Sequence, residues 1–247
     1  MSKSVEEIKK SCDGKVKTKI TKFYPIGRTS NKSFSGTFEG NTKTISNLTI
    51  DMTNETNSSD KNYVGLFGYS NGNIKGLNVK DILVKGQNNV GGLVGYQDKG
   101  NISEIILSGT IEGNNDVGGI TGYKKNGTIK SIILNENIIH SNNYGDAVAS
   151  NGYNVDGVII ESGNIQGALN MGPYSSNIYY LDGVISIYDS SATKIDKQYL
   201  HNLSYYSQLK DSSGNPIIET EATGDVNGTG YVFGYDSNNN IIIERKN

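Results

Sequence analysis

The sequence lacks most of the residues from which disulfides and common metal centres are made. Cys12 is the single cysteine among 247 residues, so neither an intramolecular disulfide nor a zinc framework of paired cysteines can form. His140 and His201 lie far apart, and neither belongs to the His-Glu-x-x-His pattern of a zinc peptidase. We therefore expect both histidines to be surface residues and predict no metallopeptidase chemistry.

Long apolar runs and an excess of one charge are also missing. The apolar runs are too short to span a bilayer, and residues 1–11 lack the apolar stretch of a signal peptide. The net charge is −2, and no basic cluster follows the N-terminal stretch, so we expect neither a nucleic-acid partner nor membrane insertion. Two locations stay open: the cytosol, or the exterior after removal of a signal peptide. Abundant Asn, Gly, Ser and Thr beside one cysteine favour an extracellular or cell-surface protein of a bacterium.

What the chain does contain is a short motif that recurs at a fixed spacing. The segment Val-Gly-Leu-Phe-Gly-Tyr at 64–69 returns as Gly-Gly-Leu-Val-Gly-Tyr at 91–96 and as Gly-Gly-Ile-Thr-Gly-Tyr at 118–123. Its leading glycine thus recurs every 27 residues, at 65, 92 and 119. Such a period is the signature of a solenoid, in which each repeat buries its apolar face against its neighbours.

Apolar residues recur with the same period and form files, meaning sets of residues at one position of successive repeats. Residues at i and i+2 of a strand share a face, so these files are predicted to line the interior. The files are Leu66, Leu93, Ile120 and Ala147; Ile74, Ile102, Ile129 and Val155; Leu77, Ile105, Ile132 and Val158; and Val79, Leu107, Leu134 and Ile160. An earlier repeat is predicted to place Ile45, Leu48 and Ile50 in the files of Ile74, Leu77 and Val79, with extra residues in a polar bulge within residues 53–61.

Each repeat holds three short apolar segments separated by turns rich in Gly and Asn, as expected for one coil of a parallel β-helix. A leucine-rich repeat is excluded because neither its signature nor its helical segment is present. We predict an all-β chain: a lead-in or cap over residues 1–22, a right-handed parallel β-helix of about 27-residue coils over 23–190, and a C-terminal cap over 191–247. Within the cap, 197–209 has helical spacing, and 231–233 with 241–243 predict a hairpin around 236–240.

Two polar files are candidates for more than packing. Tyr69, Tyr96 and Tyr123 follow each glycine motif, and their rings could stack on sugars or stabilise the coils unaided; Gly68, Gly95 and Gly122 are expected to leave the surface beside the rings low. Asn62, Asn89, Asp116 and Asn143 recur at steps of 27 residues, for which we favour a structural role through stacked amides or left-handed corners.

A candidate calcium loop lies near the C-terminus. Asp225, Asn227 and Thr229 supply oxygen donors at alternate positions, and Asp236 takes the twelfth position of an EF-hand-like loop. Thr229 replaces an expected acid, and the following residues favour a strand rather than a helix. A plain Asn-Gly turn at 227–228 explains the same residues without any metal, so calcium is the one cofactor that the sequence leaves open.

The Gly-hydrophobic-x-Gly core at 65–68, 92–95 and 119–122, with its lead-in at 23–27 and 34–48, resembles the GLUG motif of large bacterial surface proteins, including IgA-cleaving metallopeptidases and adhesins. The resemblance covers roughly residues 23–165 and implies a β-helical surface module without the peptidase domain. We therefore expect a non-catalytic spacer or adhesin-like binding domain, with a host or cell-surface glycan or protein as partner.

The alternative is a polysaccharide lyase or hydrolase on a β-helix, which requires carboxylates that converge across neighbouring coils. By the 27-residue period, Asp81 falls near Gly109, and Glu112 falls near Ile139. The other acids of the repeats likewise share no file, so no catalytic residues are assigned. Acids of the C-terminal part cannot be placed from the period.

Overall fold

The computed structural model describes residues 22–143, 145–151, 154–169, 176–188 and 192–246, together with the backbone of strands β1 (Ile8–Lys10) and β2 (Val16–Thr18). The chain is 54% strand and 7% helix, which confirms the all-β prediction. No helix in this described part is long and apolar enough to cross a membrane. Within the predicted lead-in at 1–22, the structure describes only the backbone of these two strands and residue 22, so this prediction lies mostly outside the described residues.

The repeats supply most of the strands. These are β3 (Thr37–Glu39), β4 (Thr44–Ser46), β5 (Thr49–Asp51), β6 (Asn62–Val64), β7 (Phe67–Ser70), β8 (Asn73–Lys85), β9 (Asn88–Gly91), β10 (Val94–Gln97), β11 (Asn101–Gly113), β12 (Asn115–Gly118), β13 (Thr121–Lys124), β14 (Thr128–Ser141), β15 (Gly145–Asp146), β16 (Ala149–Ser150), β17 (Val155–Ile160), β18 (Gly163–Ala168), β19 (Ser176–Leu181), β20 (Ile185–Tyr188) and β21 (Thr193–Ile195). Short 3₁₀ helices lie at Ser30–Lys32 (η1) and Ser58–Lys61 (η2).

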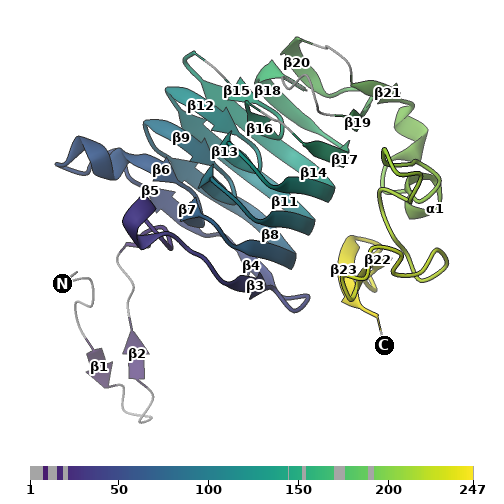
Figure 1. The fold of residues 1–247 in the computed structure, drawn as a ribbon, viewed down its shortest axis with the longest axis horizontal. Coiled ribbons are helices and arrows are strands. Elements are labelled where there is room, and N and C mark those ends of the chain that lie inside the picture. Colours follow the sequence, from purple (N-terminus) through teal and green to yellow (C-terminus); the bar gives the residue numbers. More distant parts are fainter. Residues whose placement is uncertain are drawn as a thin grey trace.

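These strands pair in parallel with their counterparts in the next repeat, here called the next rung. One path through the main sheet runs β21-β19-β17-β14-β18-β15-β12-β9-β6, while β8 and β11 continue it from β14. A second sheet has the order β16-β13-β10-β7. The parallel sheet is curled, and Figure 1 shows equivalent strands of successive rungs side by side. The sheet includes β21 and therefore extends past residue 190, the predicted boundary.

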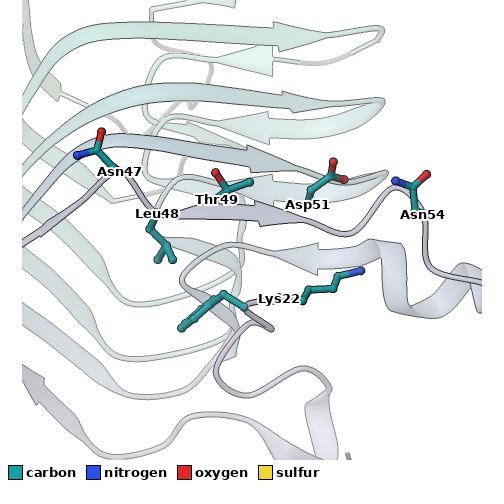
Figure 2. Close-up of a pocket in the computed structure, with 7 residues that line it drawn as sticks. Lys22, Asn47, Leu48, Thr49, Asp51 and Asn54 are labelled. Carbon is teal, nitrogen blue, oxygen red and sulfur yellow. The ribbon is translucent and has the colours of Figure 1, made fainter. Parts of the chain in front are cut away.

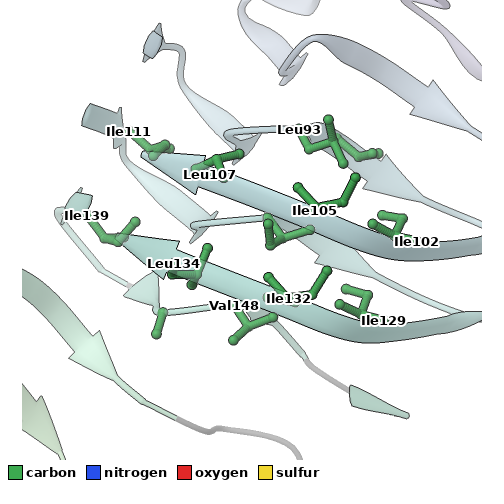
Figure 3. Packing of buried hydrophobic residues seen from close by; sticks show 14 of the residues in the cluster. Leu93, Ile102, Ile105, Leu107, Ile111, Ile129, Ile132, Leu134, Ile139 and Val148 are labelled. Carbon is green, nitrogen blue, oxygen red and sulfur yellow. The ribbon is translucent and has the colours of Figure 1, made fainter. Parts of the chain in front are cut away.

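The strand register confirms the predicted interior files except at Ala147. Gly118 pairs with Asp146 and Thr121 with Ala149, so Val148, and not Ala147, lies beside Ile120 in the file of Leu66 and Leu93. The step between these two rungs is 28 residues instead of 27, which shifts this position by one residue. Ile102 pairs with Ile74 on one side and with Ile129 on the other, and Ile105 lies between Leu77 and Ile132 in the same way. The side chains of these files are at most 3% exposed, and Figure 3 shows those of the central rungs, such as Ile105 and Ile132, pointing into one shared interior. Burying each aliphatic side chain contributes roughly 1.5–3 kcal/mol, so the stack is held together along its whole length.

The predicted register of the first repeat is wrong. Phe38 pairs with Ile74, so Ile45 moves on to pair with Val79, and Ile50 pairs with Val84. The cause is the length of the insertion: ten residues separate Asp51 from Asn62, whereas two separate Lys85 from Asn88 in the next rung. The insertion lies where the polar bulge was predicted, and it contains η2.

The glycines of the motif are required by close approach of backbones. A Cβ atom on Gly92 would lie 2.4 Å from the carbonyl oxygen of Gly119, and one on Gly119 would lie 2.2 Å from that of Ala147. Contacts this short are not tolerated between heavy atoms, so Gly92 and Gly119 are required where the chain turns between the two sheets. The next rung has Ala147 at this position.

The asparagine file divides into two neighbouring files, because Asn62 pairs with Asn88 and not with Asn89. The side-chain amides of one file form a continuous ladder: Asn88 donates to Asn62 at 2.8 Å, Asn115 to Asn88 at 2.6 Å, and Asn143 to Asn115 at 2.5 Å. The other file consists of corner residues with left-handed φ angles of 52–56°: Tyr63, Asn89 and Asp116. Both structural reasons given for the predicted file therefore apply, each to a different set of residues.

The C-terminal segment contains the predicted hairpin and a helix shorter than predicted. Strands β22 (Tyr231–Tyr235) and β23 (Ile241–Arg245) pair antiparallel, and the helical part is limited to η3 (Lys197–Tyr199) and α1 (Leu203–Tyr206). From β21 the segment runs back along one flank of the main sheet, so that β22 and β23 lie beside β8 and β11 (Figure 1). The C-terminal segment therefore follows the last rung in sequence and also covers one side of the stack.

A second hydrophobic core holds this segment in place. Outward-facing residues of the sheet, Ile106, Ile133 and Ile159, form one file across β11, β14 and β17. They pack against Tyr206, Phe233 and other side chains of the C-terminal segment. The main sheet is therefore apolar on both faces in this region, as is typical of a parallel sheet covered on both sides.

Candidate functional site

The tyrosine ladder forms as predicted. Tyr69, Tyr96 and Tyr123 pair in register across β7, β10 and β13. Their rings stack with centroids 4.7 and 5.0 Å apart and interplanar angles of 14° and 10°, while Tyr63 meets the first two rings edge-on at 5.7 Å. Partial burial raises the pKa of Tyr69 and Tyr96, so the phenols stay protonated.

This stacking changes what the ladder offers to a ligand. Both faces of the Tyr96 ring are covered by its neighbours, so a sugar ring can reach only an edge of Tyr96. The prediction that glycines lower the adjacent surface is wrong. Gly95 is buried, and a Cβ atom there would lie 2.4 Å from the backbone of Tyr63. Gly68 and Gly122 are likewise buried against backbone and serve packing.

The candidate calcium residues do not converge. Asp225 uses both carboxylate oxygens to accept hydrogen bonds from the backbone N–H groups of Thr229 and Gly230, each at 2.8 Å. Oδ1 of Asn227 accepts from Nζ of Lys130 at 2.8 Å. The five residues of β22 lie between this loop and Asp236, and they span about 17 Å of extended chain.

The three loop residues therefore make a turn in which the side-chain oxygens of Asp225 and Asn227 already have donors, and the hydroxyl of Thr229 itself donates to Asp225. Asp236 closes the β22–β23 hairpin instead, accepting from the backbone N–H groups of Asn238 and Asn240. Over the described residues, no group of three or more His, Cys, Asp or Glu side chains is placed to hold a metal ion.

A hollow of about 490 Å³ lies at the first rung beside β5. Figure 2 shows Leu48 extending from this rung towards the segment that carries Lys22. The polar groups here are engaged locally: Lys22 forms an ion pair with Glu55, and Asp51 accepts from the hydroxyl of Thr53 at 2.6 Å. That hydroxyl lowers the pKa of Asp51. The hollow is wide open and carries few groups that could select a ligand.

A groove of about 350 Å³ lies between the flank of the sheet and the C-terminal hairpin. One wall is formed by polar residues from successive rungs, each of which directly follows a member of one paired file. The file is Val79, Leu107, Leu134 and Ile160, and the polar residues are Lys80, Ser108, Asn135 and Glu161. The hairpin supplies the other wall, and aliphatic side chains contribute from both sides. Its lining residues are Thr44, Asn78, Val79, Lys80, Ile106, Ser108, Ile133, Asn135, Glu136, Glu161, His201, Asp236, Asn240, Ile241 and Ile242.

A buried carboxylate and an imidazole meet at one end of this groove. The side chain of Glu161 is 1% exposed; its Oε2 lies 3.0 Å from Nδ1 of His201, and its Oε1 accepts from Tyr206 Oη at 2.9 Å and from the backbone N–H of His201 at 3.2 Å. The bond to Glu161 raises the pKa of His201, and burial raises the pKa of Tyr206. Because Glu161 engages Nδ1, the other ring nitrogen of His201 is left for the groove.

His140 is exposed as expected, whereas His201 has a role that sequence reasoning missed. A signal for the covered flank was present in the sequence. The strands contain Ile-Ile-Leu at 105–107 and 132–134 and Val-Ile-Ile at 158–160. They lack the alternation of apolar and polar residues that is typical of a strand with one solvent-exposed face. Continuous apolar runs in parallel strands indicate burial on both faces.

The acids of the repeats differ in part from their predicted positions. A bulge after Leu107 shifts the register, so Gly109 pairs with Ile82, and Glu112 pairs with His140. Glu104, 3% exposed, interacts electrostatically with Glu219 of the C-terminal segment, and burial raises its pKa to about 7. Both carboxyl groups are buried, with each residue 3% exposed, so neither is accessible to a polysaccharide.

Comparison with known proteins gives a local likeness. No family model matches the chain, and no solved structure matches it. The chain is similar to a stretch of the halomucin of Haloquadratum walsbyi, at 38% identity over 89 residues, which is 35% of this chain. It spans about 1% of the length of that protein.

Proposed function

We propose that residues 23–195 form a right-handed parallel β-helix, and that the chain is a non-catalytic extracellular module, a spacer or adhesin-like binding domain of a larger bacterial surface protein. The observation that carries this proposal is the pair of continuous ladders, amides on one corner and tyrosines on the second sheet, repeated from rung to rung. Such ladders stiffen a stack along its axis, and a stiff rod suits a protein that must display or hold apart other parts.

Two further observations support this proposal. The resemblance to the GLUG motif implies a surface module. The likeness to halomucin covers a small part of a very long protein, as a module shared between larger proteins would. The expected partner is a host or cell-surface glycan or protein.

Polysaccharide cleavage is the competing function, and incubation with neutral and acidic polysaccharides tests it directly. Product release is followed by chromatography for the native chain and for Glu136→Gln and Asp236→Asn, because these two acids line the groove. The proposal expects no product above background. Steady release that disappears in either variant contradicts the non-catalytic function, since glycoside hydrolysis depends on individual carboxyl groups.

A further inference from the structure

The groove beside the hairpin repeats its polar groups along the axis of the stack. Lys80, Ser108, Asn135 and Glu161 each follow a residue of one paired file, so they come from four successive rungs. With about 4.8 Å between rungs, this wall is about 14 Å long. An extended ligand lying parallel to the axis would therefore meet Lys80, Ser108 and Asn135 on successive rungs. At the fourth rung it would meet His201, because the carboxylate of Glu161 is buried against His201 and Tyr206.

Charges of opposite sign are mixed along the groove. Lys80 and Asp236 face it from opposite walls, and each acts electrostatically on the other. At the far end, His201 interacts with Glu136 as well as with Glu161. This mixture gives little preference for a polyanion or a polycation, since each charge of one sign lies near its opposite.

The same mixture suits hydroxyl groups. A hydroxyl both donates and accepts, so successive hydroxyls of one ligand can accept from a cationic donor such as Lys80 and donate to an acceptor such as Glu136. The amides of Asn135 and Asn240 add further polar groups, and Ile106 and Ile241 supply apolar surface for C–H faces. Concave sites with an apolar lining and a few placed polar groups are typical of small-ligand binding.

We propose that this groove binds a short, uncharged, linear oligosaccharide aligned with the axis of the stack. The inference deepens the proposed binding function and rests on it. In this proposal Lys80, Glu136, His201 and the hairpin bind the oligosaccharide, and the tyrosine ladder only stabilises the fold.

The experiment titrates the full chain with cellohexaose, maltohexaose and chitohexaose, and with a trigalacturonate and an extended Ser/Thr-rich peptide as competitors. Because the chain has two histidines, the imidazole signals in proton NMR report the site directly, with His140 as internal reference. The variant Lys80→Gln/Glu136→Gln changes two exposed groove side chains. Lys99→Gln/Glu221→Gln makes the same changes at exposed positions outside the groove.

The proposal expects one of the neutral hexasaccharides to shift the His201 signals and leave those of His140 in place. It also expects about a tenfold or greater loss of affinity in the groove variant, as for one or more lost hydrogen bonds to charged groups, with unchanged melting temperature and an unaffected control. Failure of every neutral saccharide to bind at millimolar concentration overturns it, as does stronger binding of the trigalacturonate or of the peptide. Saccharide binding that survives in the groove variant but is lost on changing the tyrosine ladder overturns the groove and leaves the proposed function standing.

Discussion

The side-chain amide of Asn115 donates to Oδ1 of Asn88 across 2.6 Å, although 27 residues separate the two in the chain. The side-chain amide of Asn88 in turn donates to Oδ1 of Asn62. Each amide thus acts as donor to one rung and acceptor from the next, which couples the rungs at a half-buried corner.

Replacing Asn88 by Ala is expected to destabilise the fold by about 1–3 kcal/mol, because two side-chain hydrogen bonds are lost and both neighbours are left unsatisfied. Urea unfolding measures the change. The matched control is Asn142→Ala, which removes one exposed bond to Asn114 and is expected to cost less than about 1 kcal/mol. Equal effects of the two changes would contradict the ladder as a source of stability.

The variant with Tyr69, Tyr96 and Tyr123 all changed to Ser is expected to melt at a lower temperature and to keep any saccharide binding. Each stacked pair contributes about 0.5–1.5 kcal/mol beyond its buried area. A thermal melt and a glycan array check the two outcomes separately. Weaker glycan binding at an unchanged melting temperature would show that the ladder is itself the site.

Ile132 and Ile133 are neighbours that point to opposite faces of β14, one into the stack and one under the C-terminal segment. Changing either to Ala is expected to cost about 2–5 kcal/mol, since both are at most 1% exposed. Chemical denaturation compares them with Ile138→Ala, whose side chain is 48% exposed and whose loss is expected to cost little. If Ile133→Ala behaves like Ile138→Ala, the C-terminal segment does not cover this face.

Glu104 predicts a dependence of stability on pH. Its pKa is raised from 4.5 to about 7, so the folded chain keeps a proton that the unfolded chain loses between these values. Stability is therefore fully present below pH 4.5 and falls as the pH rises through 7, by on the order of 3 kcal/mol.

Glu104→Gln is expected to be more stable than the native chain at pH 8 and similar to it at pH 5. Denaturation at the two pH values measures this. Glu112→Gln removes a half-exposed ion pair with Lys85 and serves as control, with an expected change below about 1 kcal/mol at both values. A Glu104→Gln variant that is less stable at pH 8 would mean that the carboxylate is needed in its charged form.

The sequence was sufficient to predict most of the interior of the stack, but not the register of the first rung or the position of Ala147. Residues such as Ile102 and Ile129 recur at the 27-residue spacing of the repeat, and this spacing can be read from the sequence without knowledge of distant contacts. The corner was harder, because the step from Asn62 to Asn88 is 26 residues and the next is 27. A slip of one residue moves a side chain to the other face of its strand.

The groove could not be predicted in this way. His201 reaches Glu161 only because the C-terminal segment turns back along the flank, and that path depends on the packing of the Ile106, Ile133 and Ile159 file. The calcium pattern at Asp225 fits the spacing of donors, but a five-residue strand carries Asp236 away from it. The spacing of residues along the sequence does not show how far a strand extends, nor does it show which oxygens already accept hydrogen bonds.

The stacking of the rungs is the central claim, and a crystal structure of the full chain tests it most directly. The account predicts Leu93 and Ile120 in neighbouring parallel segments one rung apart, about 4.8 Å, with the three tyrosine rings stacked above one another. A structure in which Leu93 and Ile120 are not neighbours along one axis would contradict the β-helix and, with it, the ladders and the groove.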